Sequence, residues 1–566
     1  MLKISIEIQV DGRSLTMNKK MTQTIMEEKL HSRNFTKWGL DMNPVVSLGA
    51  GIIVLLFSAF AFFDLEQANE IFALLNNSIV SNFDWLFILS SSLFILITLY
   101  LAFSRLGSVR IGGLEADPEF SNFAWYSMLI SAGMGIGLMF WAVGEPLYHA
   151  EFIPPIFSDP NTVNQALATT FFHWGFHPWA IYALISLALA FFAYNKGLPL
   201  SLRSVFYPVL KEKTFGLWGD AIDILAVVAC LFGLATSLGL GVQQINSGLN
   251  YLFGINISVM TQVFLIIAIT AIATLSVVSG IDKGVKFLSK MNIKLVLIFM
   301  IAILILGPTV FILKTFSNSL GLYLNDFLKS SFFISLSDSS WQGDWSVFYL
   351  AWWISWSPFV GMFIARISKG RTIREFVTAV LLVPSLLSFV WLSVFGGTAI
   401  HINQLFNGQL FATVENNLPV ALFELIQYLD IAFLQGVLRI ALSVLGTILV
   451  ISFFVTSSDS GSLVVDNITS GGKLNSPVPQ RVFWACMEGL IAIILLLIGG
   501  EEALLALQTA VISTGLPFAI ILIIMGILLV GSIRKSYKRQ KNIKDNEHFE
   551  KMIETFDVQI DEDGVA

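Results

Sequence analysis

Charged side chains are scarce in this sequence of 566 residues, since Asp, Glu, Lys and Arg make up 13% of it and hydrophobic residues 55%. A soluble globular protein carries about 25% charged residues, so this composition excludes a water-soluble fold of this size. The two cysteines, Cys230 and Cys486, lie in apolar runs, which predicts neither a disulfide framework nor a zinc motif. The polar residues 1–42 lack the compact apolar segment of a signal peptide. We therefore expect a membrane protein without a cleaved leader.

The sequence contains many long apolar runs. A membrane-spanning helix needs about 20 mostly apolar residues, and twelve segments meet this requirement. The sequence therefore predicts an all-α polytopic membrane protein. The expected spans are 44–64, 83–104, 122–144, 166–195, 219–251, 257–279, 291–315, 345–368, 375–396, 434–457, 481–499 and 505–532.

Basic residues sort the connections into two kinds. All but three of the 33 Lys and Arg residues lie in the two tails, in alternate connections or within four residues of the span ends that border them, the exceptions being Lys314, Lys329 and Arg439. By the positive-inside rule we expect both termini in the cytoplasm and a multi-pass protein of the cell (inner) membrane.

The chain then divides into a transporter domain between two cytoplasmic tails. An amphipathic connector lies inside this domain and is expected along the interface. The C-terminal tail begins with basic residues, which favours anionic lipids as a partner. The expected bounds are 1–42 for the first tail, 43–532 for the domain, 316–344 for the connector and 533–566 for the second tail.

Glycine is concentrated in the third predicted span. Gly133, Gly135 and Gly137 alternate within "SAGMGIGLMFWAVGEP", and each costs about 1 kcal/mol of helix propensity relative to alanine. This spacing favours local unwinding, which frees backbone groups for a ligand, and close helix packing is the alternative. Pro358 predicts a second interruption, in the eighth span, because it frees the carbonyl of Ile354. Paired interruptions indicate a secondary transporter with inverted repeats, at about 120–315 and 345–532.

Tryptophan gathers in the eighth span. Trp341, Trp345, Phe348, Trp352 and Trp356 recur every three or four residues and share one helical face, with Trp353 beside them. An interfacial belt explains the first two, but the later ones lie too deep for it. Trp174, Trp179 and Tyr182 form a second aromatic group in the fourth span. These rings form either a packed core or a cage, which holds a quaternary ammonium ion by cation–π attraction of about 0.5–2 kcal/mol per contact.

Five segments give the chain a resemblance to the betaine/choline/carnitine transporter family. They are "GMGIGLMFWAVGEP", "FHWGFHPWAIYAL", "FGLATSLGLGVQQI", "WWISWSPFVGMFIARISKGRTIREF" and "FFVTSSDSG". The resemblance implies a LeuT-like core of five-plus-five inverted repeats in spans 3–12, two peripheral helices and a homotrimer. It also implies import of a trimethylammonium-type compound, such as glycine betaine, choline, carnitine or trimethylamine, commonly with sodium.

The same resemblance assigns roles to individual residues. It implies that Phe348 lies on the cytoplasmic pathway. It places the following residues at the substrate: Phe140, Trp174, Trp179, Tyr182, Trp352, Trp353, Trp356, Gly133, Gly135 and Gly137.

Sodium prefers hard oxygen ligands, and two parts of the sequence offer them. Thr456 and Ser457 in "FFVTSSDSG" carry hydroxyls, for which hydrogen bonding within the helix is the alternative role. The family pattern implies further ligands from the backbone of Phe453 and from carbonyls near Ser131 and Met134.

A second sodium site of the family design is doubtful in this chain. Some members use two threonines of the fifth span, and Cys230 and Leu234 stand at those positions here. We expect one sodium ion or a site rebuilt from other groups. Sodium-independent exchangers of the family place an arginine in the core, and spans 5 and 6 contain none, which favours sodium coupling.

Other classes of function have less support. His173 and His177 are an i, i+4 pair that could bind zinc, but no carboxylate or third histidine lies nearby in that span, so we expect hydrogen bonding or packing. No nucleophile–base pair or phosphate loop predicts an enzyme, and no cofactor or nucleic-acid partner is expected. A membrane sensor would need a larger soluble output domain than the C-terminal tail. Sodium-independent exchange and proton coupling stay as alternatives.

Overall fold

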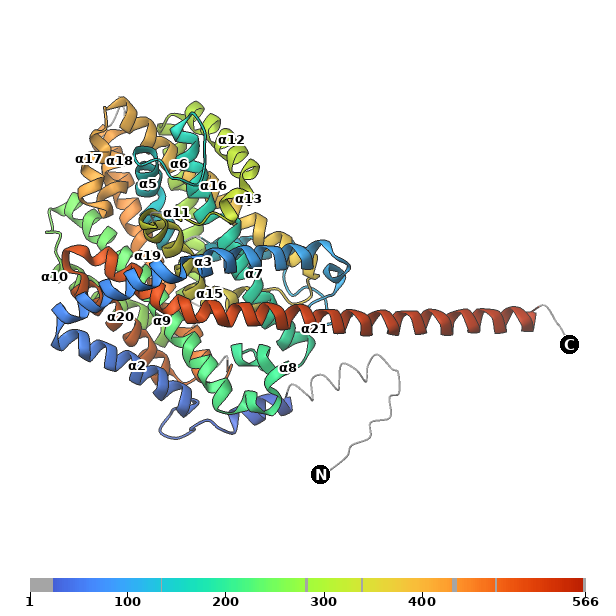
Figure 1. Cartoon of the computed structure of the whole chain (residues 1–566). Coiled ribbons are helices and arrows are strands. Elements are labelled where there is room, and N and C mark those ends of the chain that lie inside the picture. Colours follow the sequence, from blue (N-terminus) through green and yellow to red (C-terminus); the bar gives the residue numbers. More distant parts are fainter. Residues whose placement is uncertain are drawn as a thin grey trace.

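The computed structural model describes residues 24–133, 135–279, 284–336, 339–429, 435–473 and 476–562. Within these ranges the chain is helical, with no β-strand (Figure 1). Ten of the described helices are long and apolar enough to cross a membrane, and up to twelve crossings result if each of two bent pairs counts as one. This confirms the predicted all-α polytopic fold, whereas the division into inverted repeats stays a prediction.

The helices follow one another with short connections. The first half contains α2 (Pro44–Phe63), α3 (Leu65–Phe103), α4 (Asn122–Gly133), α5 (Ile136–Glu151), α6 (Thr162–Trp174), α7 (Phe176–Ala190), α8 (Tyr207–Leu210), α9 (Leu217–Phe253), α10 (Val259–Ser279) and α11 (Gly284–Leu306). The second half contains α12 (Thr309–Asn325), α13 (Phe327–Ser331), α14 (Ser340–Gln342), α15 (Phe348–Ile367), α16 (Ile373–Leu405), α17 (Gln409–Asn416), α18 (Ala421–Tyr428), α19 (Gln435–Thr469), α20 (Val478–Gly499) and α21 (Ala503–Glu562).

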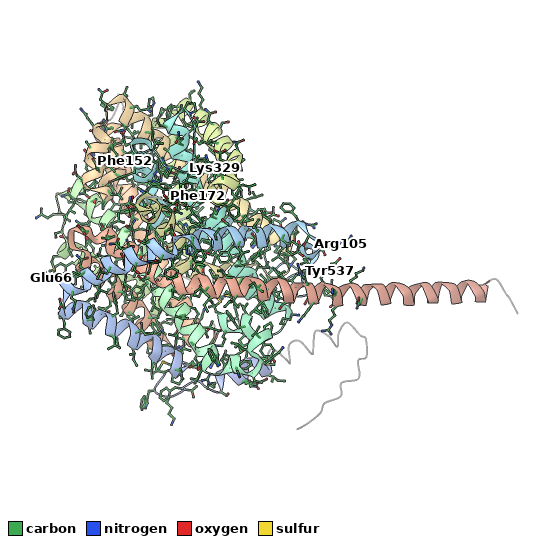
Figure 2. All side chains as sticks on the ribbon, viewed as in Figure 1. Glu66, Arg105, Phe152, Phe172, Lys329 and Tyr537 are labelled. Atoms are coloured by element: carbon green, nitrogen blue, oxygen red, sulfur yellow. The ribbon has the colours of Figure 1, made fainter. Side chains whose placement is uncertain are left out.

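Apolar side chains cover much of the surface. Phe63 and Phe103 are 85% and 78% exposed, and many other large apolar residues on the long helices are exposed too. In water such patches would be unfavourable, whereas lipid suits them. Figure 2 shows the side chains on the ribbon, with Phe152 at the exposed end of α5 and the buried Phe172 within the bundle.

Helix α15 corrects one expectation, because it runs without interruption through Pro358. The proline removes the N–H that would bond to the carbonyl of Ile354. The Ser357 hydroxyl donates to that same carbonyl at 2.7 Å. The freed acceptor is therefore satisfied locally, and the helix continues to Ile367.

The seventh span also differs from its expected bounds. The helix ends at Leu306, and α12 begins at Thr309 with its axis turned by 108°. Gly307 and Pro308 separate the two helices, and a Cβ on Gly307 would lie 2.8 Å from the Thr398 hydroxyl. The turn falls where the chain packs closely against α16, and the connector starts earlier than residue 316.

The C-terminal helix passes the expected start of the tail at residue 533 without a break. Helix α21 continues to Glu562 and projects beyond the rest of the bundle in Figure 1. The end of the last span is thus marked by the change from apolar to basic residues and not by a helix end.

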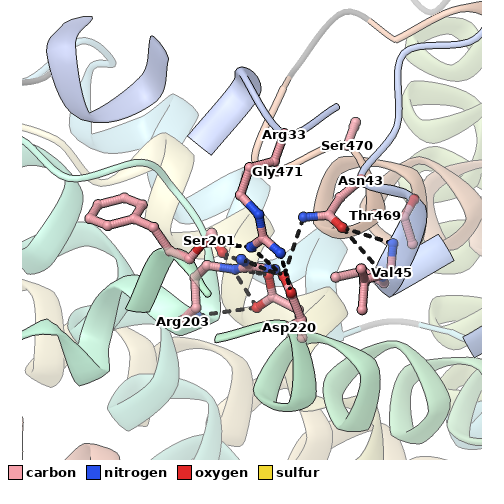
Figure 3. Close-up of polar contacts among 12 residues, drawn as sticks. Arg33, Asn43, Val45, Ser201, Arg203, Asp220, Thr469, Ser470 and Gly471 are labelled. Carbon is pink, nitrogen blue, oxygen red and sulfur yellow. Dashed lines mark hydrogen bonds and ion pairs between the residues drawn. The ribbon is translucent and has the colours of Figure 1, made fainter. Parts of the chain in front are cut away.

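The segment before α2 is fastened to the end of the bundle where α9 begins (Figure 3). Arg33 Nη2 lies 2.7 Å from Asp220 Oδ2, and the buried Arg203 contributes Nη1 at 2.9 Å from Asp220 Oδ1. Asn43 donates to Asp220 and caps α2 by accepting from the N–H of Val45. A buried carboxylate needs such partners, so these contacts fix where the first span enters.

Candidate functional site

The glycine run of the third span coincides with a helix break. Helix α4 ends at Gly133 and α5 begins at Ile136, and the axes of the two parts differ by 62°. Gly135 has extended backbone and no side chain to cap α5. The predicted interruption is therefore present, and Met134 lies outside the described residues.

Gly137 brings the backbone of α5 against two tryptophan rings. A Cβ at this position would lie 2.8 Å from Trp352 Cη2 and 3.0 Å from Trp174 Cη2. Such contacts are shorter than side chains tolerate, so glycine is needed here for the close approach of backbone and ring.

An aromatic cavity lies beside this break. Its lining comes from α4, α5, α6, α7, α9, α15, α16 and α19 together with the link at Gly135, and its free volume is about 30 Å³. That volume is far below the about 150 Å³ of a cavity that takes up benzene, so the rings must move apart to admit a ligand of that size. The lining residues are Ala132, Gly135, Ile136, Gly137, Leu138, Trp174, Pro178, Trp179, Tyr182, Ser237, Trp352, Trp353, Trp356, Ser388 and Ser457.

The rings of the aromatic cavity pack against one another both face to face and edge to face. Trp352 and Trp353 stack with centroids 4.9 Å apart, and Trp174 meets Trp353 edge to face at 4.9 Å. Trp179 and Tyr182 meet edge to face at 5.3 Å. This arrangement surrounds a small volume with aromatic rings, whose faces carry the negative end of the ring quadrupole and attract a cation without N–H donors.

Three indole N–H groups of these residues are satisfied by specific acceptors. Trp352 Nε1 donates to the carbonyl of Gly233 at 3.3 Å, and Trp353 Nε1 to the carbonyl of His173 at 2.9 Å. Trp174 Nε1 donates to Glu145 Oε2 at 2.7 Å. These bonds hold the ring planes in place.

Two other residues of the aromatic cavity each carry a polar atom without a hydrogen-bond partner in the described part of the chain. The hydroxyl of Tyr182 and Nε1 of Trp356 are buried, and neither has a hydrogen-bond partner among the residues that the structure describes. Both residues line the cavity. An unpaired buried donor is unfavourable, so a ligand that accepts hydrogen bonds would suit this place.

Two predicted residues lie outside the lining of the aromatic cavity. Phe140 is buried on α5 and packs edge to face against Trp141 at 5.2 Å. Phe348 is buried at the start of α15 and stacks on Trp352 at 5.5 Å. Phe348 is thus on the Trp345 side of the cavity, away from the basic segment that follows α15. The expected orientation makes that the outer side, so its position does not favour a cytoplasmic pathway, a role that stays a prediction.

The residues predicted to bind sodium are only partly brought together. Ser457 of α19 and Ala132 of α4 line the same cavity, and Ser131 is the chain neighbour of Ala132. The Thr456 hydroxyl donates to the carbonyls of Ser452 at 2.9 Å and Phe453 at 3.2 Å, which is the bonding within the helix that we gave as the alternative. The ion site stays a prediction.

The positions of the doubtful second sodium site are filled by apolar packing. Cys230 and Leu234 are fully buried on α9. The Leu234 side chain occupies the space beside Gly461 of α19. A Cβ added to Gly461 would lie 2.5 Å from Cδ1 of Leu234.

The sequence did not reveal a cluster formed by Glu145, His149 and His173. His173 Nδ1 lies 2.7 Å from Glu145 Oε1, and Tyr349 donates to Glu145 Oε2 at 2.6 Å. His173 and His177 thus form hydrogen bonds, one of the two roles expected of them, and His177 Nε2 lies 3.1 Å from the Ser331 hydroxyl. The carboxylate comes from another helix, which a search within the fourth span misses. The sequence did offer one indication of this cluster. Glu145 is an ionisable residue at the end of the third predicted span, and such residues in membrane segments are often functional.

A bundle of membrane-spanning helices with an aromatic cavity at a broken helix is typical of a membrane transporter. The chain belongs to the betaine/carnitine/choline family of transporters, which it matches over residues 45–538.

Individual relatives agree with this membership. The chain is 45% identical over 531 residues to a glycine betaine/proline/choline/ectoine transporter of Vibrio parahaemolyticus, covering 91% of this chain and 92% of the relative. It is 46% identical over 525 residues to glycine betaine transporter 1 of the same organism, covering 90% and 98%. A probable glycine betaine transporter of Desulfitobacterium hafniense is 42% identical over 508 residues, covering 88% and 99%. The family and these relatives are transporters and not enzymes, as the sequence predicted.

Proposed function

We propose that the protein imports glycine betaine or a close trimethylammonium relative by sodium-coupled symport. The observation that carries this proposal is the aromatic cavity, in which Trp174, Trp352 and Trp353 meet at a broken helix. The names of the relatives support the substrate class, because all three that are described above include glycine betaine.

The trimethylammonium end of the substrate fits the rings. It carries a positive charge but has no N–H to donate, so a carboxylate partner is not required, and ring faces attract it by about 0.5–2 kcal/mol per contact. The free volume of about 30 Å³ is too small for this group. Substrate entry must therefore separate the rings, which makes the described conformation a closed one.

The carboxylate end of glycine betaine fits the two unpaired donors. Tyr182 and Trp356 line the cavity, and the hydroxyl of the first and the indole N–H of the second lack partners within the described part of the chain. A carboxylate accepts such bonds strongly because it is charged. These donors would favour glycine betaine over choline, which carries a hydroxyl instead.

Sodium coupling is supported by the lining of the aromatic cavity. Ser457, a candidate ion ligand, lines it together with Ala132, the chain neighbour of the candidate Ser131. An ion there would connect the two halves of the broken span to α19 and so tie its binding to that of the substrate.

Uptake into proteoliposomes tests this proposal and separates it from the alternatives. Labelled glycine betaine should accumulate when sodium is higher outside, and it should not accumulate with potassium in its place. Accumulation driven equally well by a proton gradient, or uptake that requires substrate on the inner side, would replace symport with proton coupling or exchange. We further propose that the protein is a homotrimer in the inner membrane, with both termini in the cytoplasm.

A further inference from the structure

We propose that Glu145, His149 and His173 form a binding site for a divalent transition-metal ion, with Zn²⁺ as the preferred ion. One carboxylate oxygen and one nitrogen of each imidazole all lie within 4.8 Å of one another. Zinc binds such ligands at about 2.0–2.2 Å, so two ligands of one tetrahedral ion lie about 3.3 Å apart. The separations here are 2.7 Å from Glu145 Oε1 to His173 Nδ1 and 3.5 Å to His149 Nε2, on either side of that value.

His149 is the residue that points to a ligand. It is 1% exposed, and its Nε2 has no hydrogen-bond partner in the ranges that the structure describes. The nearest carboxylate oxygen, Glu145 Oε1, is 3.5 Å away, beyond ordinary hydrogen-bond length. An imidazole nitrogen buried without a partner is unfavourable, and a metal ion between it and Glu145 would satisfy both atoms.

His173 can change from hydrogen-bond donor to metal ligand without losing a partner. Its Nδ1 faces Glu145 Oε1, and its Nε2 lies 2.9 Å from the Ser346 hydroxyl. Without metal, the neutral ring donates from Nδ1 and accepts from Ser346. With metal, the ring proton moves to Nε2 and is donated to the same hydroxyl, which can act either way. The exchange moves one proton within the ring and leaves its charge unchanged.

The groups around the site hold its ligands in the orientation that metal binding needs. Trp174 Nε1 and the Tyr349 hydroxyl both donate to Glu145 Oε2, at 2.7 and 2.6 Å. That leaves Oε1 directed at the histidines. Metal-binding histidines and carboxylates are normally fixed by such outer hydrogen bonds.

A second cavity lies beside the site. It has a free volume of about 230 Å³, and His149 lies in its wall with Trp341 and Trp345. The His149 ring lies 4.5 Å from that of Trp345. Of the three ligands only His149 borders this space, so a hydrated ion would have to pass its ring to reach Glu145 and His173. Zinc sites with three protein ligands take a water molecule as the fourth.

An ion at this site would join α5, which carries Glu145 and His149, to α6, which carries His173. Glu145 also holds Trp174 of the aromatic cavity. Metal binding should therefore slow any movement of Trp174 that substrate entry requires. The site itself does not depend on the proposed transport, whereas this effect rests on it.

Cobalt absorption tests the site directly. The full-length chain, without a polyhistidine tag, is purified in detergent, stripped with chelator and titrated with Co²⁺. We expect one Co²⁺ per chain with the intense visible bands of four-coordinate cobalt, and their loss when Zn²⁺ is added. His149→Ala should weaken metal binding by more than about 100-fold, because even outer-shell changes cost about 10–100-fold. If His149→Ala does not fold, His149→Gln keeps a polar side chain of similar reach.

The matched control is His401→Ala, since His401 lies on α16, outside this cluster. It should bind Co²⁺ as the wild type does. Weak six-coordinate bands, no binding, or equal binding by wild type and His149→Ala would overturn the site, and so would loss of binding in His401→Ala.

In proteoliposomes, Zn²⁺ should slow glycine betaine uptake by the wild type but not by His149→Ala. Absent uptake in both proteins without Zn²⁺ would count against the proposed function, and the cobalt bands would still decide the metal site.

Discussion

At the scale of single residues, hydrogen bonds to the indole N–H groups define the aromatic cavity. Trp174, Trp352 and Trp353 are each tied to one acceptor. Each bond restricts the rotation of its ring, so less rotamer entropy is left to lose when a ligand binds. The rings still have to move apart as the substrate enters, because the free volume of about 30 Å³ is too small for a trimethylammonium group.

Trp353 should contribute at least about 1 kcal/mol to substrate binding, since its removal deletes a desolvated cation–π partner. We expect Trp353→Ala to weaken glycine betaine binding by about fivefold or more in isothermal titration. Trp353→Phe should recover part of the affinity because it keeps a ring face. Trp218→Ala, at a residue 64% exposed on α9, is the control and should leave affinity unchanged. Unchanged affinity in Trp353→Ala would remove this ring from the cage.

Tyr182 should distinguish substrates by their polar end. Tyr182→Phe keeps the ring but removes a hydroxyl that lacks a partner within the described chain. A hydrogen bond to a charged group contributes about 1.5–3 kcal/mol. Glycine betaine affinity should therefore fall by about tenfold or more, and choline affinity should change little. Equal losses for both ligands would show that the hydroxyl does not meet the carboxylate.

The sequence predicted the residues of the aromatic cavity better than their polar partners. Helical spacing alone placed Trp352 and Trp356 on one face, and the cavity contains both. Glu145 could not be assigned in this way, because its partners come from α6 and α15, and contacts between helices leave no periodic pattern in one sequence.

At the scale of helices, close packing against the broken third span requires glycine. The Cβ of an alanine at 137 would lie 2.8 Å from Trp352. Gly137→Ala should therefore displace a ring and reduce glycine betaine binding by at least about tenfold, as overpacking typically costs about 1–3 kcal/mol. Gly531→Ala on α21 is the matched control, since no atom lies within 4 Å of its added Cβ. Normal binding by Gly137→Ala, measured by titration, would contradict this packing.

Helix interruptions show what sequence can and cannot predict at this scale. Gly133 to Gly137 and Gly307–Pro308 each coincide with a bend, and glycine or proline explains both. Pro358 does not interrupt α15, because the Ser357 hydroxyl satisfies the carbonyl that the proline frees. The outcome depends on a side-chain rotamer, which the pattern of residues does not encode.

At the scale of the whole molecule, transport requires that ion and substrate binding are coupled. Sodium sensitivity should therefore change when both hydroxyls of the candidate ion site are removed. For Thr456→Ala/Ser457→Ala we expect weaker substrate binding at fixed sodium and partial recovery at higher sodium, because coupling between two ligands is reciprocal. Thr447→Ala, elsewhere on α19, is the control and should keep the sodium dependence of the wild type.

The same uptake measurement reports the number of sodium ions. Because Cys230 and Leu234 offer no hydroxyl at the positions where some members of the family are expected to carry threonines, the Hill coefficient for sodium should be close to one. A coefficient clearly above one would contradict a single site. Full activity of the double variant at low sodium would contradict the assignment of Thr456 and Ser457.

The central claim is that the aromatic cavity recognises the positive charge of a trimethylammonium group. Glycine betaine and 3,3-dimethylbutyrate have nearly the same shape, but a neutral carbon replaces the charged nitrogen in the second. Isothermal titration of the wild-type protein with both ligands, at one sodium concentration, isolates that charge. With at least two ring contacts of about 0.5–2 kcal/mol each, glycine betaine should bind at least about fivefold more tightly. Equal affinity for the two ligands would contradict the account, since the cavity would then recognise shape alone.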